Sequence, residues 1–447
     1  MNFTSNGAMT FATSRSACVD LFFMIGASRG RDISQEFAKA LHENKEWALR
    51  ILLWARDVRG GAGERQIFRD LLATLDDETK DYILPKVPEI GRWDDLLDFL
   101  DKELTINLIT NALNAENGLC AKWMPRQDKK GAKPIRHALG LSPKEYRRLL
   151  VTLSNTVEQK MCANQWDDIE FSKLPSKAAS IYQNAFNKHA AEAYEAYKTA
   201  LSDGETKINA SAIFPHEIIL SMKTGDAKVA DEQWKALPNY LDKSNRKFLP
   251  IVDVSGSMDS HNVKHIAIAL GIYLAERNNS VFKNKFISFS SDPHFHQLKG
   301  NTLQEKYNSV SRSGENMSTD LNKVFDTLLN FAILNKLKQE DLPDSLLILT
   351  DMGFDEVGFG YRKSINLSEN IEAIKTKYML AGYQCPQLVL WNLKANTGNI
   401  PVSAVADNTA LVSGFSPSVM KGILKGSTTP LDVMLDIIMD ERYNPYS

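Results

Sequence analysis

The spacing of apolar residues changes near residue 245 and divides the chain into two halves. Before that point, apolar residues recur at steps of three and four, which is the spacing of amphipathic helices. After Lys247, short apolar runs alternate with segments that carry the helical spacing. A chain of 447 residues exceeds one ordinary core. We therefore predict an α-helical domain over residues 1–245 and an α/β domain over residues 246–447.

The first half is a series of helix-patterned runs joined by short breaks. Glycine or proline marks the breaks, for example at residues 60–63, 85–88 and 140–143. Successive amphipathic helices with short turns are typical of stacked helical hairpins of the HEAT type, although no clean repeat period is visible. The helix-patterned runs are 33–53, 67–75, 82–87, 96–113, 146–161, 178–201 and 215–224.

The second half has the strand–helix alternation of a mainly parallel, doubly wound, Rossmann-like sheet. A short antiparallel excursion is expected at residues 292–296. In such sheets ligands bind at the carboxyl ends of the strands. The predicted strands are 248–254, 285–290, 345–350, 387–393 and 409–412, and the predicted helices are 263–277, 321–335, 367–379 and 431–439.

The motif with the clearest chemistry is Asp253-Val254-Ser255-Gly256-Ser257, between the first predicted strand and the next helix. Its acid and its two serines are hard oxygen donors at alternate positions on one loop. Mg²⁺ prefers small oxygen ligands in near-octahedral geometry, completed by water or by a partner's carboxylate or phosphate. The motif therefore predicts a site for Mg²⁺, or for another divalent cation such as Mn²⁺ or Ca²⁺.

Two further residues complete the predicted metal site. Thr319 opens the next long helix, and Asp351 follows the next core strand. Asp253 and Asp351 thus stand at the carboxyl ends of two strands, where the binding crevice of such a sheet lies. The alternative is that Asp253 and the serines cap the following helix, but a cap does not require Asp351. The predicted metal ligands are Asp253, Ser255, Ser257, Thr319 and Asp351.

The same loop argues against three classes of enzyme. An aspartyl-phosphate phosphatase would carry a second Asp at position 255, where the chain has Ser255. A G-x-S-x-G nucleophile elbow is absent, because Asp253 precedes Ser255 where Gly is needed. The chain also lacks the G-x-x-x-x-G-K-[ST] motif of P-loop ATPases. We therefore expect a binding protein rather than an enzyme.

Composition and charge restrict the partners. The formal net charge is −2, so attraction to a polyanion must come from a local patch. The four cysteines lie far apart without CxxC spacing, which favours reduced thiols and a cytoplasmic protein. The apolar stretch 21–27 is followed, not preceded, by its arginines, unlike a secretory signal. No apolar run reaches the length of a membrane span, so no membrane partner is expected.

Residues 122–148 form the main basic region, with nine basic and two acidic residues. Trp123, His137 and Tyr146 are interleaved among them, and cations next to aromatic faces are typical of RNA binding. The alternative is a solvated loop between helices.

The arginine- and glycine-rich segment 56–65 resembles a phosphate nest. The alternative is a tight turn between helices whose arginines are solvated or paired with Asp57 and Glu64. Taken together, the predicted nucleic-acid-binding residues are Lys122, Arg126, Lys129, Lys130, Lys133, Arg136, Arg147, Arg148, Arg56, Arg59 and Arg65.

The second half resembles the von Willebrand factor A (vWA) family. The pattern Asp-x-Ser-x-Ser, then a Thr, then an Asp, is the metal-ion-dependent adhesion site (MIDAS) of that family, and all five predicted ligands match it. In that family the two serines and the threonine ligate the metal directly or through water, and an acidic group of a ligand completes the coordination. The resemblance therefore implies a Mg²⁺ site that binds a partner.

The first half resembles the TROVE module, the helical-repeat ring of the Ro and telomerase-associated proteins. The whole chain looks closest to a TROVE-like plus vWA family found in phages, fungi and plants. In Ro proteins the vWA domain closes a basic-lined ring that binds RNA in its hole and on its outer surface. The helical half is short for a full ring, so the resemblance implies a smaller or open hole here. The segments that carry it are 56–65, 122–125, 146–150, 157–158, 175–178 and 215–219.

These observations lead to three hypotheses about function. The first is a non-enzymatic, Mg²⁺-binding protein that binds small structured or single-stranded RNA through its basic residues. The second is a protein-binding adaptor, in which the metal captures an Asp or Glu of a partner protein. The third is a structural or assembly component that uses the helical domain as a scaffold.

Overall fold

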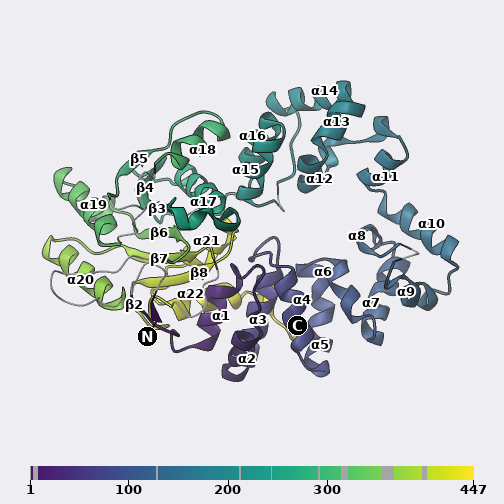
Figure 1. Cartoon of the computed structure of the whole chain (residues 1–447), viewed down its shortest axis with the longest axis horizontal. Helices are drawn as coiled ribbons and strands as arrows, with labels where there is room; N and C mark the ends of the chain where they lie inside the picture. Colours follow the sequence, from purple (N-terminus) through teal and green to yellow (C-terminus); the bar gives the residue numbers. More distant parts are fainter. Residues whose placement is uncertain are drawn as a thin grey trace.

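The structure is a computed structural model that describes residues 2–3, 9–126, 129–210, 213–242, 244–289, 292–313, 321–353, 367–394 and 400–447. Its first part is helical, and the described strands of its second part form one six-stranded sheet (Figure 1). This layout agrees with the expected order of a helical region followed by an α/β region.

The helical part contains shorter helices than the apolar spacing predicts, because single residues interrupt the runs. Asn44 ends one helix and caps the next by accepting a hydrogen bond from Trp47 N at 3.0 Å. Asn155, with a φ of 35°, ends another helix in the left-handed region. The helices are α1 Ala17–Ile25, α2 Ser34–Glu43, α3 Lys45–Arg56, α4 Gln66–Thr74, α5 Asp77–Ile83, α6 Val87–Ile90, α7 Glu103–Asn114, α8 Gly118–Trp123, α9 Ala132–Ala138, α10 Pro143–Ser154, α11 Val157–Cys162, α12 Ser176–Ile181, α13 Gln183–His189, α14 Ala191–Ser202, α15 Pro215–Thr224 and α16 Ala227–Lys235.

The sheet has the strand order β5-β4-β3-β6-β7-β8, and its strands are parallel except for the edge strand β5. The five predicted parallel strands are confirmed to within one residue at either end, and β5 supplies the antiparallel excursion. The strands are β3 Phe248–Asp253, β4 Lys285–Phe289, β5 Phe295–Gln297, β6 Ser345–Thr350, β7 Gln387–Asn392 and β8 Thr409–Ser413, and the chain begins with the short pair β1 Asn2–Phe3 and β2 Met9–Thr10.

Helices connect these strands, as the alternating pattern predicts. The spacing indicated neither α18 nor the short α21. The helices of this part are α17 Val263–Arg277, α18 Leu303–Ser311, α19 Leu321–Leu334, α20 Leu367–Leu380, α21 Met420–Ile423 and α22 Pro430–Ile438. Short 3-10 helices across the chain are η1 Leu84–Lys86, η2 Trp93–Phe99, η3 Trp166–Asp168, η4 Phe171–Lys173, η5 Gly256–Asn262, η6 Gln339–Asp341, η7 Pro417–Val419 and η8 Glu441–Tyr443.

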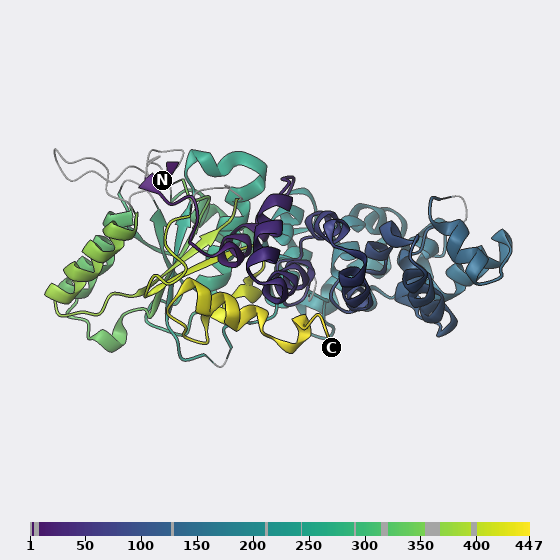
Figure 2. The same cartoon turned by 90° about the horizontal axis from the view of Figure 1, so that it is seen from below.

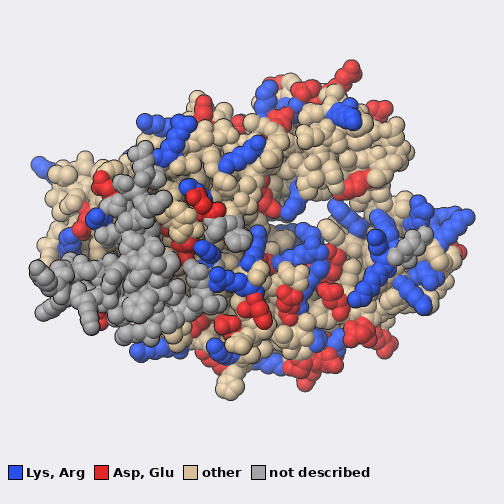
Figure 3. Space-filling model, in the orientation of Figure 1, with Lys and Arg blue, Asp and Glu red and all other residues tan. Residues whose placement is uncertain are grey.

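The helices leave the sheet domain and return to it, so that the two parts together enclose an opening (Figure 1). Helices α1 to α6 run along one side, α7 to α10 form the far end, and α11 to α16 lead back. A space-filling view shows the background through this opening (Figure 3). Seen from below, the helical part extends from one side of the sheet domain as a flat layer (Figure 2). The helices therefore form an arc that the sheet domain closes.

Residues from distant parts of the sequence make the closure. Helix α1 packs on β8, where Gly26 N donates to Ser413 Oγ at 3.0 Å and that hydroxyl donates to Phe22 O at 2.8 Å. At the other end of the arc, α15 packs against α17. Both contacts belong to one continuous hydrophobic core. The apolar stretch near residue 21 is thus a buried helix at this joint, and no helix among the described residues is both long and apolar enough to cross a bilayer.

Candidate metal centre and basic surface

The sheet brings Asp253 and Asp351 to the same edge. Strands β3 and β6 are neighbours in parallel register, with Val252 opposite Leu349. Asp253 is the last residue of β3, and Asp351 directly follows β6. Because β3 lies between β4 and β6, the strand order reverses at this point. Such a topological switch point is where open α/β sheets bind their ligands.

Asp253 is fully buried, and its carboxylate is held from two sides. Oδ1 accepts a hydrogen bond from Ser255 N at 3.0 Å, and Oδ2 accepts one from Thr350 Oγ1 at 2.6 Å. The pKa of Asp253 is raised to about 6, chiefly by burial and also by the charge of Asp351, while these hydrogen bonds act in the opposite direction. A positive charge next to this carboxylate would stabilise its ionised form.

The two serines of the motif lie side by side on the loop after β3. Ser255 Oγ and Ser257 Oγ are 3.1 Å apart, and Ser255 is buried. The chain then continues into η5, and α17 begins only at Val263, with Asn262 as its N-cap residue. Asp253 therefore does not cap the following α-helix, and the capping alternative is wrong.

Asp351 has a neighbour that the sequence did not indicate. Its Oδ1 accepts a hydrogen bond from Gly353 N at 3.1 Å, and its Oδ2 lies 3.5 Å from the Nζ of Lys394, just beyond β7. The Asp351 side chain is buried, whereas the Lys394 side chain is 30% exposed. In the part of the site that the structure describes, Asp351 thus has one ammonium neighbour. A lysine shortly after a strand carries no metal-binding signal, so only the fold could place it here.

These donors suit a small, hard cation. Two hydroxyls and two carboxylates at one edge of the sheet are the oxygen ligands that Mg²⁺ prefers. Nowhere in the described ranges do three or more His, Cys, Asp or Glu side chains meet to hold a metal, so a metal at this edge would depend on the serine oxygens. Thr319, the fifth predicted ligand, lies outside the described residues.

The main basic region spans helices α8, α9 and α10 at the far end of the ring. Lys and Arg side chains gather over these helices and along the nearby border of the opening (Figure 3). Five of the predicted nucleic-acid-binding residues here, which we call the basic face, are exposed and form no ion pair with any other residue that the structure describes. The basic face consists of Lys129, Lys130, Lys133, Arg147 and Arg148.

Other predicted members of this region are half-buried and partly engaged. Arg136 Nη1 donates to Leu141 O at 3.1 Å, which closes the end of α9. Tyr146 is buried, and its hydroxyl donates to Pro125 O at 3.2 Å, so this ring supports the fold instead of offering a face to a base. Lys122 and Arg126 are half-buried without an ion pair among the described residues, and Trp123 is half-exposed.

The glycine-rich segment 56–65 is a largely buried connection between α3 and α4. Gly61 N donates to Asp57 O at 3.1 Å, and Ala62 N donates to Trp54 O at 3.2 Å. A Cβ atom on Gly63, whose φ is +72°, would lie 2.5 Å from the ring of Phe214 at the start of α15. Amide groups that are already paired cannot cradle a phosphate. The interpretation as a nest is therefore wrong, and the alternative of a tight turn between helices describes the segment.

The arginines of this segment differ in what they contact. Arg56 is buried and forms an ion pair with Asp95 at 2.6 Å. Arg65 pairs with Asp94, and Arg59 is exposed without an ion pair to a described residue. A buried and paired guanidinium cannot reach a phosphate in solution, so the assignment of Arg56 to nucleic-acid binding is corrected.

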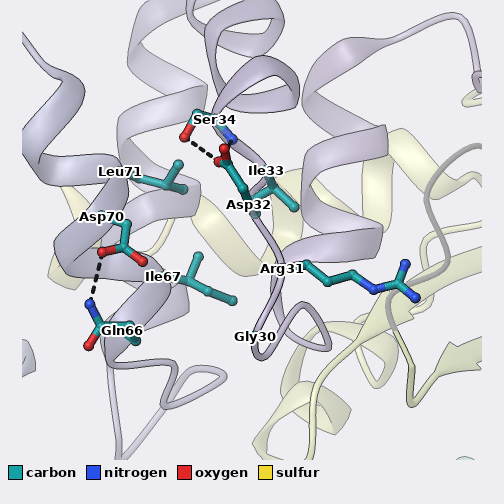
Figure 4. A pocket seen from close by; sticks show the side chains of 9 residues that line it. All are labelled: Gly30, Arg31, Asp32, Ile33, Ser34, Gln66, Ile67, Asp70 and Leu71. Atoms are coloured by element: carbon teal, nitrogen blue, oxygen red, sulfur yellow. Dashed lines mark hydrogen bonds between the residues drawn. The ribbon is translucent and has the colours of Figure 1, made fainter.

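A cavity of about 450 Å³ lies between the α1–α2 connection and α4 (Figure 4). Its acids have internal partners: Asp32 accepts a hydrogen bond from Ser34 Oγ at 2.6 Å, and Asp70 accepts one from Gln66 Nε2 at 2.8 Å. Arg31 points away from the other polar groups. We assign no ligand to this cavity.

Comparisons with known proteins match both halves of the chain. A domain of unknown function, DUF2828, matches residues 4–78 and 99–246, and a second, DUF7788, matches residues 247–439. A relative from Acanthamoeba polyphaga mimivirus, the uncharacterized protein L728, is 31% identical over 512 residues, covering 100% of this chain and 88% of that protein. The chain therefore belongs to the same family as this mimivirus protein, and its helical and sheet parts match DUF2828 and DUF7788 in turn.

Proposed function

We propose that this protein is a non-enzymatic RNA-binding protein that binds RNA through its basic face. The observation that carries the proposal is that exposed cations gather on α9, α10 and the loop before them without forming ion pairs with the described residues. Between residues 122 and 148, nine basic residues stand against two acidic ones, although the whole chain has a net charge of −2. A local excess of this size favours a polyanion.

The physical basis is the release of counterions from the RNA backbone. Each phosphate that a lysine or arginine neutralises releases counterions, so affinity rises with the number of contacts and falls with salt. Trp123, half-exposed at the end of α8, adds an aromatic surface next to these cations. Aromatic contacts of this kind favour single strands or structured RNA over a regular duplex.

We further propose that the two parts are a TROVE-like helical-repeat region and a vWA-like domain. The resemblance in sequence implies a ring that the vWA domain closes, and the arc of helices joined at both ends to the sheet domain supports it (Figure 1). The position of Asp253 and Asp351 at the switch point supports a MIDAS-like site.

In this proposal the sheet edge holds Mg²⁺. Ser255 and Ser257 would contact the ion, Asp253 and Asp351 would balance its charge, and Thr319 is the fifth predicted ligand. When bound, the ion supplies a fixed positive charge to which an acidic group of a partner can ligate. The residues of this chain keep that position preorganised through the hydrogen bonds to Asp253.

The RNA-binding proposal is tested by removing four cations of the basic face together. The variant Lys129→Ala/Lys130→Ala/Arg147→Ala/Arg148→Ala should bind a labelled single-stranded RNA more weakly than the wild type. Each lost phosphate contact should reduce the slope of log affinity against log salt by about 0.7. Fluorescence anisotropy over a range of KCl concentrations measures both quantities.

A matched control uses exposed lysines elsewhere in the helical part. Lys39 and Lys188 form no ion pair with residues in the described ranges, and replacing both with Ala should leave the salt slope unchanged. The proposal fails if the wild type does not bind RNA at low salt, or if the control variant weakens binding as much as the quadruple variant does.

A protein-binding adaptor is the second candidate function. The observation that favours it is the pair of buried carboxylates at neighbouring strand ends, together with two serine hydroxyls on the loop after β3. An adaptor should keep its partner at high salt and lose it with a chelator or with Asp253→Ala. If the partner is still pulled down in the presence of a chelator and by the Asp253→Ala variant, this function is excluded.

A further inference from the structure

A cluster of arginines lies where the end of α3, the start of α4 and η2 meet. Arg56 and Arg69 contact Asp95 at 2.6 and 2.7 Å, and Arg69 also contacts Asp94 at 3.2 Å. Three guanidinium groups contact the two carboxylates and that of Arg92 lies near them, so the four arginines exceed the two acids by two positive charges. We call this set the arginine cluster, and it consists of Arg56, Arg65, Arg69 and Arg92 with Asp94 and Asp95.

Arg92 is the member of the cluster whose side chain forms no ion pair with the described residues. Its backbone N–H, not its guanidinium, donates to Asp95 Oδ2 at 3.0 Å. The guanidinium lies over the ring of Trp123, 4.5 Å from the centroid. Burial lowers the pKa of Arg92, and the charges of Arg65 and Arg56 also lower it, whereas those of Asp94 and Asp95 raise it. A half-buried cation that lies close to other cations and has no ion pair of its own is stabilised by an anion.

The cluster is open to a ligand at the border of the ring. Arg92 follows α6 and Trp123 ends α8, and both helices lie along the opening (Figure 1), where Lys and Arg side chains gather (Figure 3). Arg65 is 44% exposed. Lys122, whose Nζ lies 5.7 Å from the Trp123 ring, also lines a cavity of about 290 Å³ between α8 and residues 169–175. Lys122 is therefore close to both the Trp123 ring and this cavity.

We infer that Arg92, with Arg65 and Lys122 beside it, binds a phosphodiester group of the RNA strand at the border of the opening. This inference rests on the proposed RNA-binding function and adds a defined phosphate contact to it. A guanidinium presents paired N–H donors that match two phosphate oxygens, and Trp123 holds the guanidinium of Arg92 in one orientation. The basic face then contacts the strand further along, on the same side of the ring.

The first test uses inorganic phosphate, which needs no RNA. At matched ionic strength, phosphate should raise the midpoint of thermal unfolding of the full chain relative to chloride. The variant Arg92→Ala should lose this increase, and Arg92→Lys should retain part of it, because lysine keeps the charge without the paired donors. Arg31→Ala removes an exposed arginine outside the cluster and should behave as the wild type does. If phosphate does not stabilise the wild type, or stabilises Arg92→Ala equally, the inference is overturned.

The second test separates RNA from free phosphate. Arg92→Ala should weaken the binding of a single-stranded RNA by about tenfold, the effect of losing one charge-assisted contact. Binding should also change the tryptophan fluorescence of the wild type, and Trp123→Phe should remove most of that change.

If the quadruple variant of the basic face loses RNA binding but Arg92→Ala does not, the proposed function stands and this inference fails. If no RNA binds but phosphate stabilises the protein through Arg92, the proposed function fails and the anion site remains.

Discussion

Two pairs of carboxylates in this molecule have opposite charge balances. Asp94 and Asp95, in the helical part, contact three guanidinium groups and lie near a fourth, that of Arg92, whereas at the sheet edge the described residues supply one ammonium, that of Lys394 beside Asp351. All four carboxylates are buried, so water screens their surroundings weakly. The first site therefore favours an anion and the second a cation. Acidic residues in a sequence thus do not mark a metal site by themselves, because the charges that the fold places around them decide which ion is stabilised.

The largest effect is expected from removing an acid of the arginine cluster. Asp95→Ala leaves the buried Arg56 without its carboxylate and increases the excess of positive charge. Breaking a buried ion pair in this way costs about 3–5 kcal/mol, and the free energy of unfolding measured with urea should fall by that amount. Asp77→Ala is the control, because Asp77 is 83% exposed and its loss should cost no more than about 1 kcal/mol. Equal losses in the two variants would contradict the buried character of the cluster.

A smaller and pH-dependent effect is expected at the sheet edge. The pKa of Asp253 rises from an ordinary value of 3.8 to about 6 on folding, so the folded state holds its proton to higher pH than the unfolded state does. The free energy of unfolding should therefore fall by about 3 kcal/mol as the pH rises from about 4 to about 6, and stay lower above that. Asp253→Asn keeps an oxygen that accepts the hydrogen bond from Ser255 N but has no proton that titrates in this range. Urea unfolding in EDTA should show no such fall for this variant, which should be more stable than the wild type at alkaline pH.

Mg²⁺ sharpens this prediction. Adding the ion above pH 6 should stabilise the wild type, because a ligand that binds only the folded state shifts the equilibrium toward it. It should not stabilise Asp253→Asn. If Mg²⁺, Mn²⁺ and Ca²⁺ all leave the free energy of unfolding of the wild type unchanged, the sheet edge is not a cation site. The contrast between a cation site there and an anion site at the arginine cluster is then wrong.

Removing Lys394 should make the net charge at the sheet edge more negative. Lys394→Ala leaves Asp351 without its ammonium neighbour, and because that lysine is partly exposed the loss should cost only about 1 kcal/mol. The site then carries one more net negative charge, so its affinity for Mg²⁺ should rise several-fold. Titration calorimetry with the ion measures this change, and Lys375→Ala, which removes a lysine paired with Glu372, is the control. A lower affinity in Lys394→Ala would show that the lysine supports the site instead of competing with a cation.

The sheet part could be predicted closely from the sequence because buried parallel strands appear as continuous apolar runs. All residues of β3, β6 and β7 are buried, so their ends are sharp in the sequence, and Asp253 and Asp351 could be placed at neighbouring strand ends. Lys394 could not be found in this way. It belongs to a different strand end, and no residue pattern links it to Asp351.

The charges of the helical part could not be predicted, because their partners come from far along the chain. The nearest acids to the glycine-rich segment are Asp57 and Glu64, and both serve other arginines: Arg442 lies 2.6 Å from Asp57, and Arg29 lies 2.9 Å from Glu64. The partner of Arg56 is Asp95 instead. Packing of the chain brings such residues together, which leaves no fixed spacing in the sequence.

The smallest effect on stability is expected from Arg65→Ala. This variant tests whether Arg65 or Arg92 is the main contact of the bound anion. Arg65 is 44% exposed, and Arg69 still contacts Asp94 at 3.2 Å when Arg65 is removed, so the free energy of unfolding should fall by less than about 1 kcal/mol. The excess positive charge then falls from two to one while Arg92 keeps its place over Trp123. Phosphate should therefore still raise the midpoint of thermal unfolding in Arg65→Ala, but by less than in the wild type, whereas Arg92→Ala should lose the increase. The reverse order of the two variants would place the anion on Arg65, at the exposed edge of the cluster, and leave the guanidinium on Trp123 with a purely structural role.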